Sequence, residues 1–433
     1  MWSRVKHFLP ILLVFVAGQP SRCDSPVPDL RVGLAVHRES VRFSGSAGLT
    51  ISGPSSHGPF GSVPAGEVWE ARVSGQSVLL VDSGGSTIGP LSMPLRLVPP
   101  QGGTTVIEDI ADHWDKRTNR EYRGVIEIRA DGAGRLNVIN IVDIETYLRG
   151  VVPSEMPASY SLEALKAQAV AARGQALIKG RRHDANGFDL CATPHCQVYG
   201  GATSEDPRTD QAVSETRGEV LAYQGRLADT LYSSTCGGHT VDNEDYWAQQ
   251  QPVPYLRGVA DFEPEDGVGL MFPLWGEPLK QYLKYAPRVN CYQSRYAKSD
   301  KIRWWLTAPR GQMQEKLTTA LGDFGDLLDV RVVERAESGI VRKVVVIGSR
   351  KLMPLVGGEA IRKTLGLQSA TFVIEAFREK PSDLPVVFVI YGAGWGHQVG
   401  MCQVGAAGLA DKGWDYQRIL KKYYQGCTVE RRW

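Results

Sequence analysis

Alternation of apolar and charged residues predicts strands in the first third of the chain. From residue 122 to 129, Tyr122, Gly124, Ile126 and Ile128 alternate with positions that include the charged Arg123, Glu127 and Arg129. Residues 131–134 form a turn signal, after which Leu136 resumes the period of two that marks a half-buried strand. We predict a hairpin here and a mainly β segment over residues 30–140. The Gly, Ser and Pro cluster at 52–66 predicts a loop.

A different period begins after this segment. Over residues 161–179 apolar side chains recur at steps of three and four, which predicts a helix, and Ser161 is expected to cap it. The recurring residues are small, Leu162, Leu165, Ala169, Ala172 and Ala176. Small side chains allow close approach, so we expect this helix to be central. Lys166 and Arg173 lie on its opposite face.

The remaining pattern mixes both element types. Helices are predicted at 312–321 and 360–367, and strands at 328–334, 340–347, 371–375 and 386–391. The expected fold class is α+β, with a β-rich amino-terminal part, a mixed core and an appended α+β lobe. The expected division is 1–18 leader, 19–29 linker, 30–140 β-rich part, 141–261 core, 262–375 appended lobe and 376–433 segment completing the core.

Composition narrows the class of protein. The 433 residues are 42% hydrophobic and 22% charged, which suits a globular chain of two or three units. Because 49 basic residues nearly balance 47 acidic ones, no strong field draws the chain to nucleic acid. We expect no nucleic-acid partner.

The amino terminus resembles a secretory leader. Arg4, Lys6 and His7 precede an apolar run over residues 8–18, which is too short to span a bilayer. We predict a signal peptide, export to the periplasm or cell wall, and no stable membrane span in the mature chain. An oxidising compartment would permit disulfides among the seven cysteines, and the odd number leaves at least one unpaired.

Five ordered blocks resemble one known family. They are YLRGVVPSEMPASYSLEALKAQAVAARGQAL from Tyr147, DLCATPHCQVYGG from Asp189, TRGEVLAYQGRLADTLYSSTCGGHT from Thr216, GGEAIRKTLGLQSATFVI from Gly357 and GWGHQVGMCQVGAAGLADKG from Gly394. Together they resemble the stage II sporulation protein D family, also called SpoIID/LytB, over roughly residues 120–430. The resemblance implies an exported protein that acts on peptidoglycan, either as a lytic transglycosylase or as a helper of a cell-wall amidase. Cysteines at 236, 402 and 427 depart from the usual pattern.

The resemblance places the catalytic carboxylate at Glu155. A lytic transglycosylase uses the 6-hydroxyl of its substrate, so one carboxylate can act first as acid and then as base. The partly apolar turn around Glu155 is expected to raise its pKa by desolvation. A hydrolase would need a second carboxylate, for which Asp189 and Asp242 are the nearest candidates. Without the resemblance, Glu155 would be interpreted as a solvated loop residue or a helix cap.

Further residues are assigned to a glycan groove by their place in the family pattern. They are Lys166, Gln168, Arg173, Tyr199, Tyr232, Ser233, Ser234 and Thr235. The alternative for Lys166, Gln168 and Arg173 is a solvated helix face. The alternative for residues 232–238 is a tight turn. Trp395 and His397 lie among glycines, where an aromatic ring can stack on a sugar or pack in the core.

Cys191, His195 and Cys196 offer zinc ligands within one loop. Some family members bind zinc there, so one zinc ion is predicted; a Cys191–Cys196 disulfide is the alternative, and a Cys–His nucleophile ranks last. Natural pairings for the other cysteines are Cys236 with Cys291 and Cys402 with Cys427, although sequence does not establish connectivity.

Overall fold

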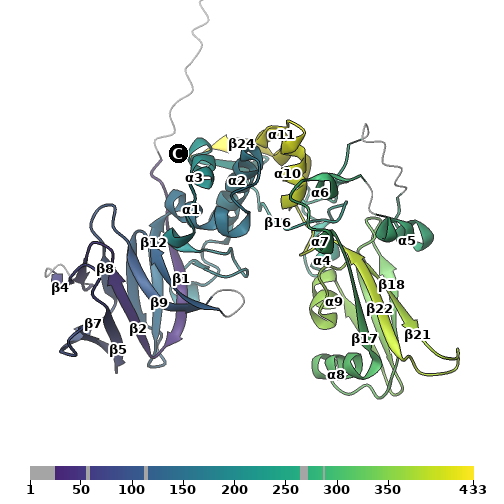
Figure 1. Cartoon of the computed structure of the whole chain (residues 1–433), viewed down its shortest axis with the longest axis horizontal. Helices are drawn as coiled ribbons and strands as arrows, with labels where there is room; N and C mark the ends of the chain where they lie inside the picture. Colours follow the sequence, from purple (N-terminus) through teal and green to yellow (C-terminus); the bar gives the residue numbers. More distant parts are fainter. Residues whose placement is uncertain (1–24, 55–58, 112–115, 264–271, 286–287) are drawn as a thin grey trace, which may run out of the picture.

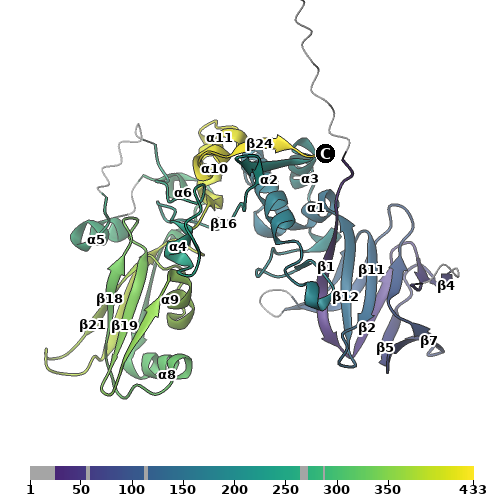
Figure 2. The same cartoon turned by 180° about the vertical axis from the view of Figure 1, so that it is seen from behind.

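The computed structural model describes residues 25–54, 59–111, 116–263, 272–285 and 288–433. Two β-rich parts lie on either side of a layer of helices (Figure 1), and the view from behind shows the same arrangement (Figure 2). The expected leader at residues 1–18 lies outside the described residues, and so does Cys23 in the expected linker. The chain is a mixed α+β protein, which confirms the predicted fold class.

Two sheets build the amino-terminal part. Their strand orders are β13-β1-β12-β11-β8-β3-β4 and β10-β9-β2-β5-β6-β7. Inward side chains such as Val32 and Phe43 are fully buried, which explains the period of two. The predicted hairpin is confirmed as β11 and β12. The strands are β1 (Asp29–Arg38), β2 (Ser40–Gly45), β3 (Leu49–Ser52), β4 (Pro59–Val63), β5 (Trp69–Ser74), β6 (Ser77–Val81), β7 (Thr87–Ser92), β8 (Leu95–Val98), β9 (Thr105–Ala111), β10 (Arg117–Tyr122), β11 (Val125–Ala130), β12 (Leu136–Asp143) and β13 (Leu190–Cys191).

The loop predicted at 52–66 is wrong in part. Residues 59–63 form β4, which pairs with β3 and lies at the edge of its sheet. An edge strand tolerates Pro59 and Gly61 because one side of it makes no ladder hydrogen bonds. The sequence signal for a loop and that for an edge strand are therefore the same here.

Helix α2 lies at the centre of the helical layer. The layer comprises α1 (Ile144–Glu155), α2 (Leu162–Lys179), α3 (Pro207–Glu215), α10 (Gln403–Asp411) and α11 (Tyr416–Tyr423), with single 3-10 turns at Asp184–Asn186 and Gly201–Ser204. The other four helices and β14 (Glu219–Tyr223) all contact α2, which confirms its predicted central position. Ser161 occupies the N-cap position, but its hydroxyl makes no capping bond and instead donates to Oδ1 of Asp411 at 2.5 Å.

The carboxy-terminal part contains the predicted helices and strands. Sheets β17-β22-β21 and β18-β19-β20 pack with two helices on a separate hydrophobic cluster. The elements are β17 (Arg303–Pro309), α8 (Arg310–Leu321), β18 (Leu327–Arg335), β19 (Val341–Gly348), β20 (Leu352–Val356), α9 (Gly358–Leu365), β21 (Phe372–Phe377) and β22 (Val387–Ala393). The domain boundary expected at residue 375 falls inside β21, and β22 pairs with β21 and β17. The lobe therefore extends beyond the predicted 262–375.

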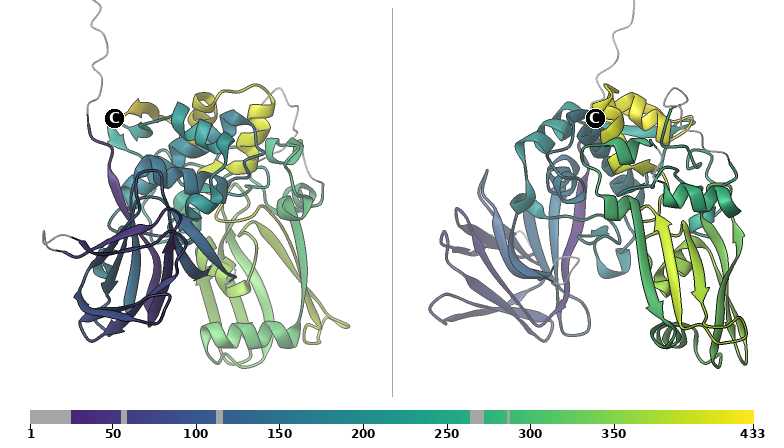
Figure 3. Two further views of the ribbon diagram at one scale, coloured as in Figure 1. Left: turned by 60° about the vertical axis from the view of Figure 1, so that its left-hand side comes forward. Right: turned by 45° about the vertical axis from the view of Figure 1, so that its right-hand side comes forward.

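After β22 the chain returns to the helical layer. There β24 (Thr428–Arg431) pairs with β14, and β23 (Met401–Cys402) pairs with β16 (Tyr232–Ser233). Figure 3 shows α10 and α11 beside α2, between the two β-rich parts. The remaining elements are β15 (Arg226–Leu227), α4 (Asn243–Tyr246), α5 (Gly276–Lys284), α6 (Asn290–Gln293) and α7 (Ser299–Ile302). Within the described ranges, no helix combines the length and apolar character that a bilayer crossing requires.

Candidate active site

Glu155 is the last residue of α1. The side chain of Asp143 caps the first turn of this helix by accepting from the N–H groups of Glu145 and Thr146. Met156 then adopts an extended backbone and Pro157 follows, so the helix ends there. The expectation of a loop at Glu155 was wrong because Pro153, inside the helix, and Pro157 together mimic a loop signal.

A cavity of about 120 Å³ opens beside Glu155. Among the described residues, Glu155 is the only carboxylate that lines it. Two stacked rings, Tyr160 and Tyr296, form part of the wall with centroids 4.3 Å apart. The complete lining is Glu155, Met156, Pro157, Tyr160, Ser234, Thr235, Tyr296, Lys298, Lys301, Ile302, Gln403 and Val404. The candidates Asp189 and Asp242 are not in it; Asp242 pairs with Arg257 at 3.0 Å.

The carboxyl group of Glu155 is poised to titrate near neutrality. Burial raises its pKa to about 7, while the N–H of Val198 and the positive charge of Lys179 act in the opposite direction. The Val198 N–H donates to Oε1 at 2.6 Å. Desolvation dominates, as the apolar surroundings predicted. A carboxyl group with this pKa can donate and accept a proton at neutral pH.

Gln403 holds the backbone at Glu155. Its Nε2 donates to the carbonyl oxygen of Glu155 at 3.1 Å and to Oε1 of Gln168 at 3.3 Å. Gln168 is fully buried behind this pair. It is therefore a support for the site and does not border a groove, contrary to the expectation.

The segment that contains β16 contributes only in part to the cavity. Ser234 and Thr235 line the cavity, as expected. Tyr232 and Ser233 are buried behind it, and the Tyr232 hydroxyl accepts from Nε2 of Gln197 at 2.9 Å. A groove contact for these two is therefore wrong in this structure, since neither reaches the cavity surface.

Three other predicted groove residues serve packing or ion pairing. Tyr199 is buried, and its hydroxyl donates to Oδ1 of Asn140 at 2.8 Å. Arg173 is fully buried and pairs with Glu145 at 2.8 Å. Lys166 pairs with Glu163 at 2.8 Å and Glu215 at 2.6 Å. None of the three lines the cavity, so their assignment to a groove is corrected.

The two aromatic residues of the glycine-rich block, Trp395 and His397, differ in their relation to the cavity. Lys301, in the lining, places its Nζ 5.2 Å from the ring centroid of Trp395. His397 packs against Trp247, with ring centroids 5.3 Å apart. Burial lowers the pKa of His397 to about 3, so it is neutral. His397 is thus a packing residue, whereas Trp395 adjoins the cavity through Lys301.

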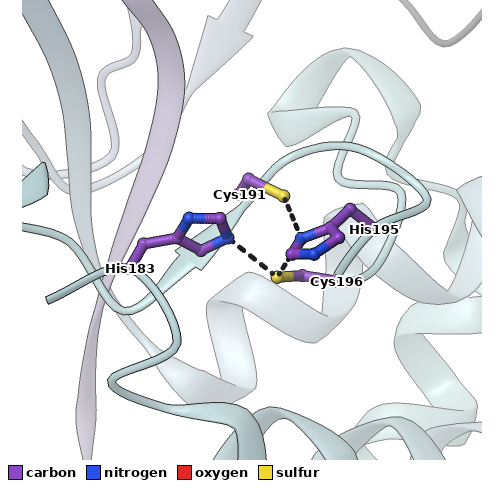
Figure 4. Close-up of side chains that lie close together, drawn as sticks. All are labelled: His183, Cys191, His195 and Cys196. Carbon is purple, nitrogen blue, oxygen red and sulfur yellow. Dashed lines mark hydrogen bonds between the residues drawn. The ribbon is translucent and has the colours of Figure 1, made fainter. Parts of the chain in front are cut away.

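The predicted metal loop brings together four potential metal ligands, of which His183 was missed in the sequence. Figure 4 shows His183, Cys191, His195 and Cys196 pointing toward one another. Their ligand atoms lie within 4.8 Å of each other. Sγ of Cys196 is 3.4 Å from Nε2 of His183 and 3.7 Å from Nδ1 of His195. Ligands around tetrahedral zinc are separated by roughly 3.4–3.8 Å, so these four residues fit zinc.

The predicted disulfide Cys402–Cys427 is not supported. Cys402 lies beside Cys236 and Cys291, within a buried cluster that includes Asp261 but not Cys427. None of the six cysteines that the structure describes is in a disulfide.

Comparison with known proteins gives the family. The family described as "Stage II sporulation protein" matches residues 132–223, and one described as "Domain of unknown function (DUF8618)" matches 242–400. An uncharacterized protein of Brachyspira hyodysenteriae is 32% identical over 294 residues, which cover 67% of this chain and 68% of that protein. The chain belongs to the SpoIID/LytB family.

Two named relatives come from Bacillus subtilis (strain 168). The "Amidase enhancer" is 31% identical over 295 residues, which cover 65% of this chain but only 40% of the relative. "Stage II sporulation protein D" is 28% identical over 303 residues, or 66% of this chain and 74% of the relative. Glu155 and the metal loop both fall within the family match, whereas the lobe belongs to the second match.

Proposed function

We propose that this protein is an exported lytic transglycosylase that cleaves peptidoglycan glycan strands, with Glu155 as its acid and base. The observation that carries the proposal is that Glu155, the one carboxylate among the described residues of the cavity lining, has a pKa of about 7. Names of the relatives, an amidase enhancer and a sporulation protein, support a role at the cell wall.

One carboxyl group suffices for this reaction. Protonated Glu155 gives its proton to the glycosidic oxygen as the bond from that oxygen to the anomeric carbon breaks. The 6-hydroxyl oxygen of the same sugar then bonds to the anomeric carbon and passes its proton to Glu155. The carboxyl group is regenerated, and the product carries a 1,6-anhydro end. Water is not consumed, so the second carboxylate of a hydrolase is not needed.

We further propose, as the family resemblance implies, that the substrate strands have already lost their stem peptides. Removing the peptide leaves a free lactyl carboxylate on each N-acetylmuramic acid. Lys298 and Lys301 lie in the cavity lining and have no carboxylate partner among the described residues. A cation there attracts the lactyl carboxylate, and the stacked pair of Tyr160 and Tyr296 contributes apolar surface to the wall beside it.

Zinc in the metal loop would serve Glu155 indirectly. We propose that His183, Cys191, His195 and Cys196 hold one zinc ion, which when bound fixes the loop as a closed structural site. Val198, two residues after Cys196, donates the hydrogen bond to Glu155. Gln197 accepts from the Tyr147 hydroxyl at 3.2 Å. An ordered loop therefore keeps the N–H of Val198 on the carboxyl group.

A second function is favoured by one comparison. One relative is named "Amidase enhancer". The alternative proposal is that this chain binds peptidoglycan and stimulates an N-acetylmuramoyl-L-alanine amidase. In that case the cavity would bind glycan without cutting it. Glycan cleavage requires Glu155 to give and accept a proton, whereas stimulation of an amidase does not.

Mass analysis of digested glycan tests the proposal. The mature chain is incubated with purified strands that retain or lack stem peptides. We expect 1,6-anhydro ends, lighter by one water than hydrolysis products, and mainly from stripped strands. Glu155→Gln should lose roughly 100- to 10,000-fold in rate. The matched control Glu315→Gln, on an exposed residue of α8, should retain it.

Each other outcome selects an alternative. Reducing ends would establish a hydrolase. Full activity of Glu155→Gln would remove Glu155 from the mechanism. Absence of cutting, together with acceleration of an amidase by the wild-type chain, would establish the helper function.

A further inference from the structure

A second cluster of potential ligands lies in the interior, apart from the metal loop. Sγ of Cys236, Cys291 and Cys402 and a carboxylate oxygen of Asp261 lie within 4.8 Å of one another. All four residues are buried, with 1% exposure or less. No part of the proposed reaction uses them.

Charge makes this cluster unusual. Asp261 is fully buried, and none of the ion pairs in the described part of the chain involves it. An ionised carboxylate in such a position is costly unless a positive charge compensates it. A divalent cation at the centre of the cluster would provide that charge.

The hydrogen bonds around the cluster suit thiolates. Sγ of Cys402 accepts from the N–H groups of Cys236 and Gly405, both at 3.2 Å. Sγ of Cys236 accepts from the N–H of Gly238 at 3.4 Å. Cys402 also caps the amino terminus of α10, where the helix dipole favours a negative group. These donors offset the net negative charge that three thiolates and a carboxylate retain around a divalent ion.

Hydrogen bonds orient the carboxylate of Asp261, as is usual for a metal-ligating carboxylate. The Tyr423 hydroxyl donates to its Oδ1 at 2.7 Å, and the N–H of Cys291 donates to its Oδ2 at 2.8 Å. Such outer hydrogen bonds orient ligating carboxylates. Gly405 permits the close approach, because a Cβ there would lie 2.5 Å from Oδ1 of Asp261.

From this geometry we infer that Cys236, Asp261, Cys291 and Cys402 bind one zinc ion in a tetrahedral structural site. Three sulfur ligands and one oxygen suit zinc, for which Zn–S is about 2.3 Å and neighbouring sulfurs lie about 3.8 Å apart. Binding releases the thiol protons to solvent. A disulfide would engage only two of the cysteines and would leave the third thiol and the carboxylate buried without a counter-charge.

A zinc ion at this site would hold together the segments that form the walls of the Glu155 cavity. Ser234 and Thr235 immediately precede Cys236, and Gln403 and Val404 immediately follow Cys402. The lining residues from Tyr296 to Ile302 lie shortly after Cys291. One ion would therefore join three segments that are far apart in the sequence. This role is independent of the reaction that the cavity performs.

Zinc content of the full mature chain, purified without chelator, tests the inference. We expect Cys402→Ser to contain about one zinc ion per chain less than the wild type. The control Cys427→Ser changes a buried cysteine outside both clusters and should keep the wild-type content. Cys191→Ser, which removes a ligand of the metal loop, should still take up cobalt with the sulfur charge-transfer bands of three thiolates.

Peptide mapping of the wild type keeps the inference falsifiable if Cys402→Ser does not fold. With thiols blocked at lysis, we expect Cys236, Cys291 and Cys402 all to be recovered unpaired, with zinc present in the intact chain. A disulfide between any two of them would overturn the site. Unpaired thiols in a chain whose zinc is entirely lost in Cys191→Ser would overturn it as well.

Discussion

The backbone N–H of Val198 donates a hydrogen bond of 2.6 Å to Oε1 of Glu155. This bond favours the ionised carboxylate, whereas burial favours the protonated acid, and burial is the larger effect. The balance leaves the pKa of Glu155 at about 7. A neighbouring loop thus sets how acidic the proposed catalytic group is.

The pH dependence of glycan cleavage should report this pKa. Because the first step needs protonated Glu155, kcat/KM should fall as pH rises through about 7. The rate is measured with stripped strands over a pH series at constant ionic strength. An activity that stays level from about pH 6 to 9 would contradict the role of Glu155 as acid.

Glu155→Gln should also change how stability depends on pH. The folded-state pKa lies above the unfolded value, so the folded state binds more protons between about pH 4.5 and 7. The wild type therefore loses up to about 3 kcal/mol of unfolding free energy as pH rises through this range. Glutamine stays neutral, so the variant should be more stable than the wild type at about pH 8 and similar at about pH 4. Urea denaturation at both values measures the difference; equal stability at the higher pH would show that the carboxyl group is well solvated.

Periodicity was sufficient to predict the elements whose partners lie close in sequence. The β11–β12 hairpin and α2 follow directly from apolar spacing. Helix α1 was missed because Pro153 interrupts its pattern, although its Asp143 cap is a recognisable start signal. Glu155 was found only through the family resemblance, since one glutamate carries no pattern of its own.

Side-chain roles were harder to predict because they depend on distant segments. Arg173 resembles a solvated helix residue until Glu145, 28 positions earlier, is placed beside it. His183 lies eight positions before Cys191, beyond the spacing of a compact metal motif, and the Asp184–Asn186 turn brings it back. The cluster at Cys236 joins residues up to 166 positions apart, which no local spacing can indicate.

Removing a ligand from the metal loop should lower zinc content and stability together. We expect His183→Asn to lose about one zinc ion per chain and to unfold at a lower temperature, because metal bound to the folded state adds to its stability. Activity should fall as the loop carrying Val198 loosens. Elemental analysis measures the zinc content, and thermal unfolding measures the stability.

The control His37→Asn alters an exposed histidine that pairs with Asp131, and this variant should keep the wild-type zinc content. Zinc retained in full by His183→Asn would exclude His183 as a ligand.

Arg173→Met should destabilise the fold by about 3–5 kcal/mol, because it leaves the buried Glu145 carboxylate without its partner. Replacing both residues by apolar ones should recover much of that loss. Lys166→Met, at a partly exposed ion pair, should cost about 1 kcal/mol or less. Denaturant unfolding of these variants measures how much each ion pair contributes to stability, and so tests whether Arg173 has a structural role. A well-folded Arg173→Met with a raised KM would restore Arg173 to the glycan groove.

Lys301→Gln should weaken binding of stripped strands. Lys301 lines the cavity beside Trp395 and has no carboxylate partner among the described residues, so its charge is available to the lactyl group. Loss of one partly exposed ion pair costs about 0.5–1 kcal/mol, or roughly a 2- to 5-fold rise in KM. The effect should shrink as salt is added, because screening weakens the wild-type contact. Steady-state rates at low and high salt measure the change in KM.

The control Lys351→Gln changes an exposed lysine outside the cavity lining and should leave KM unchanged. Equal KM values for Lys301→Gln and Lys351→Gln at low salt would show that the strand passes the cavity without meeting this charge.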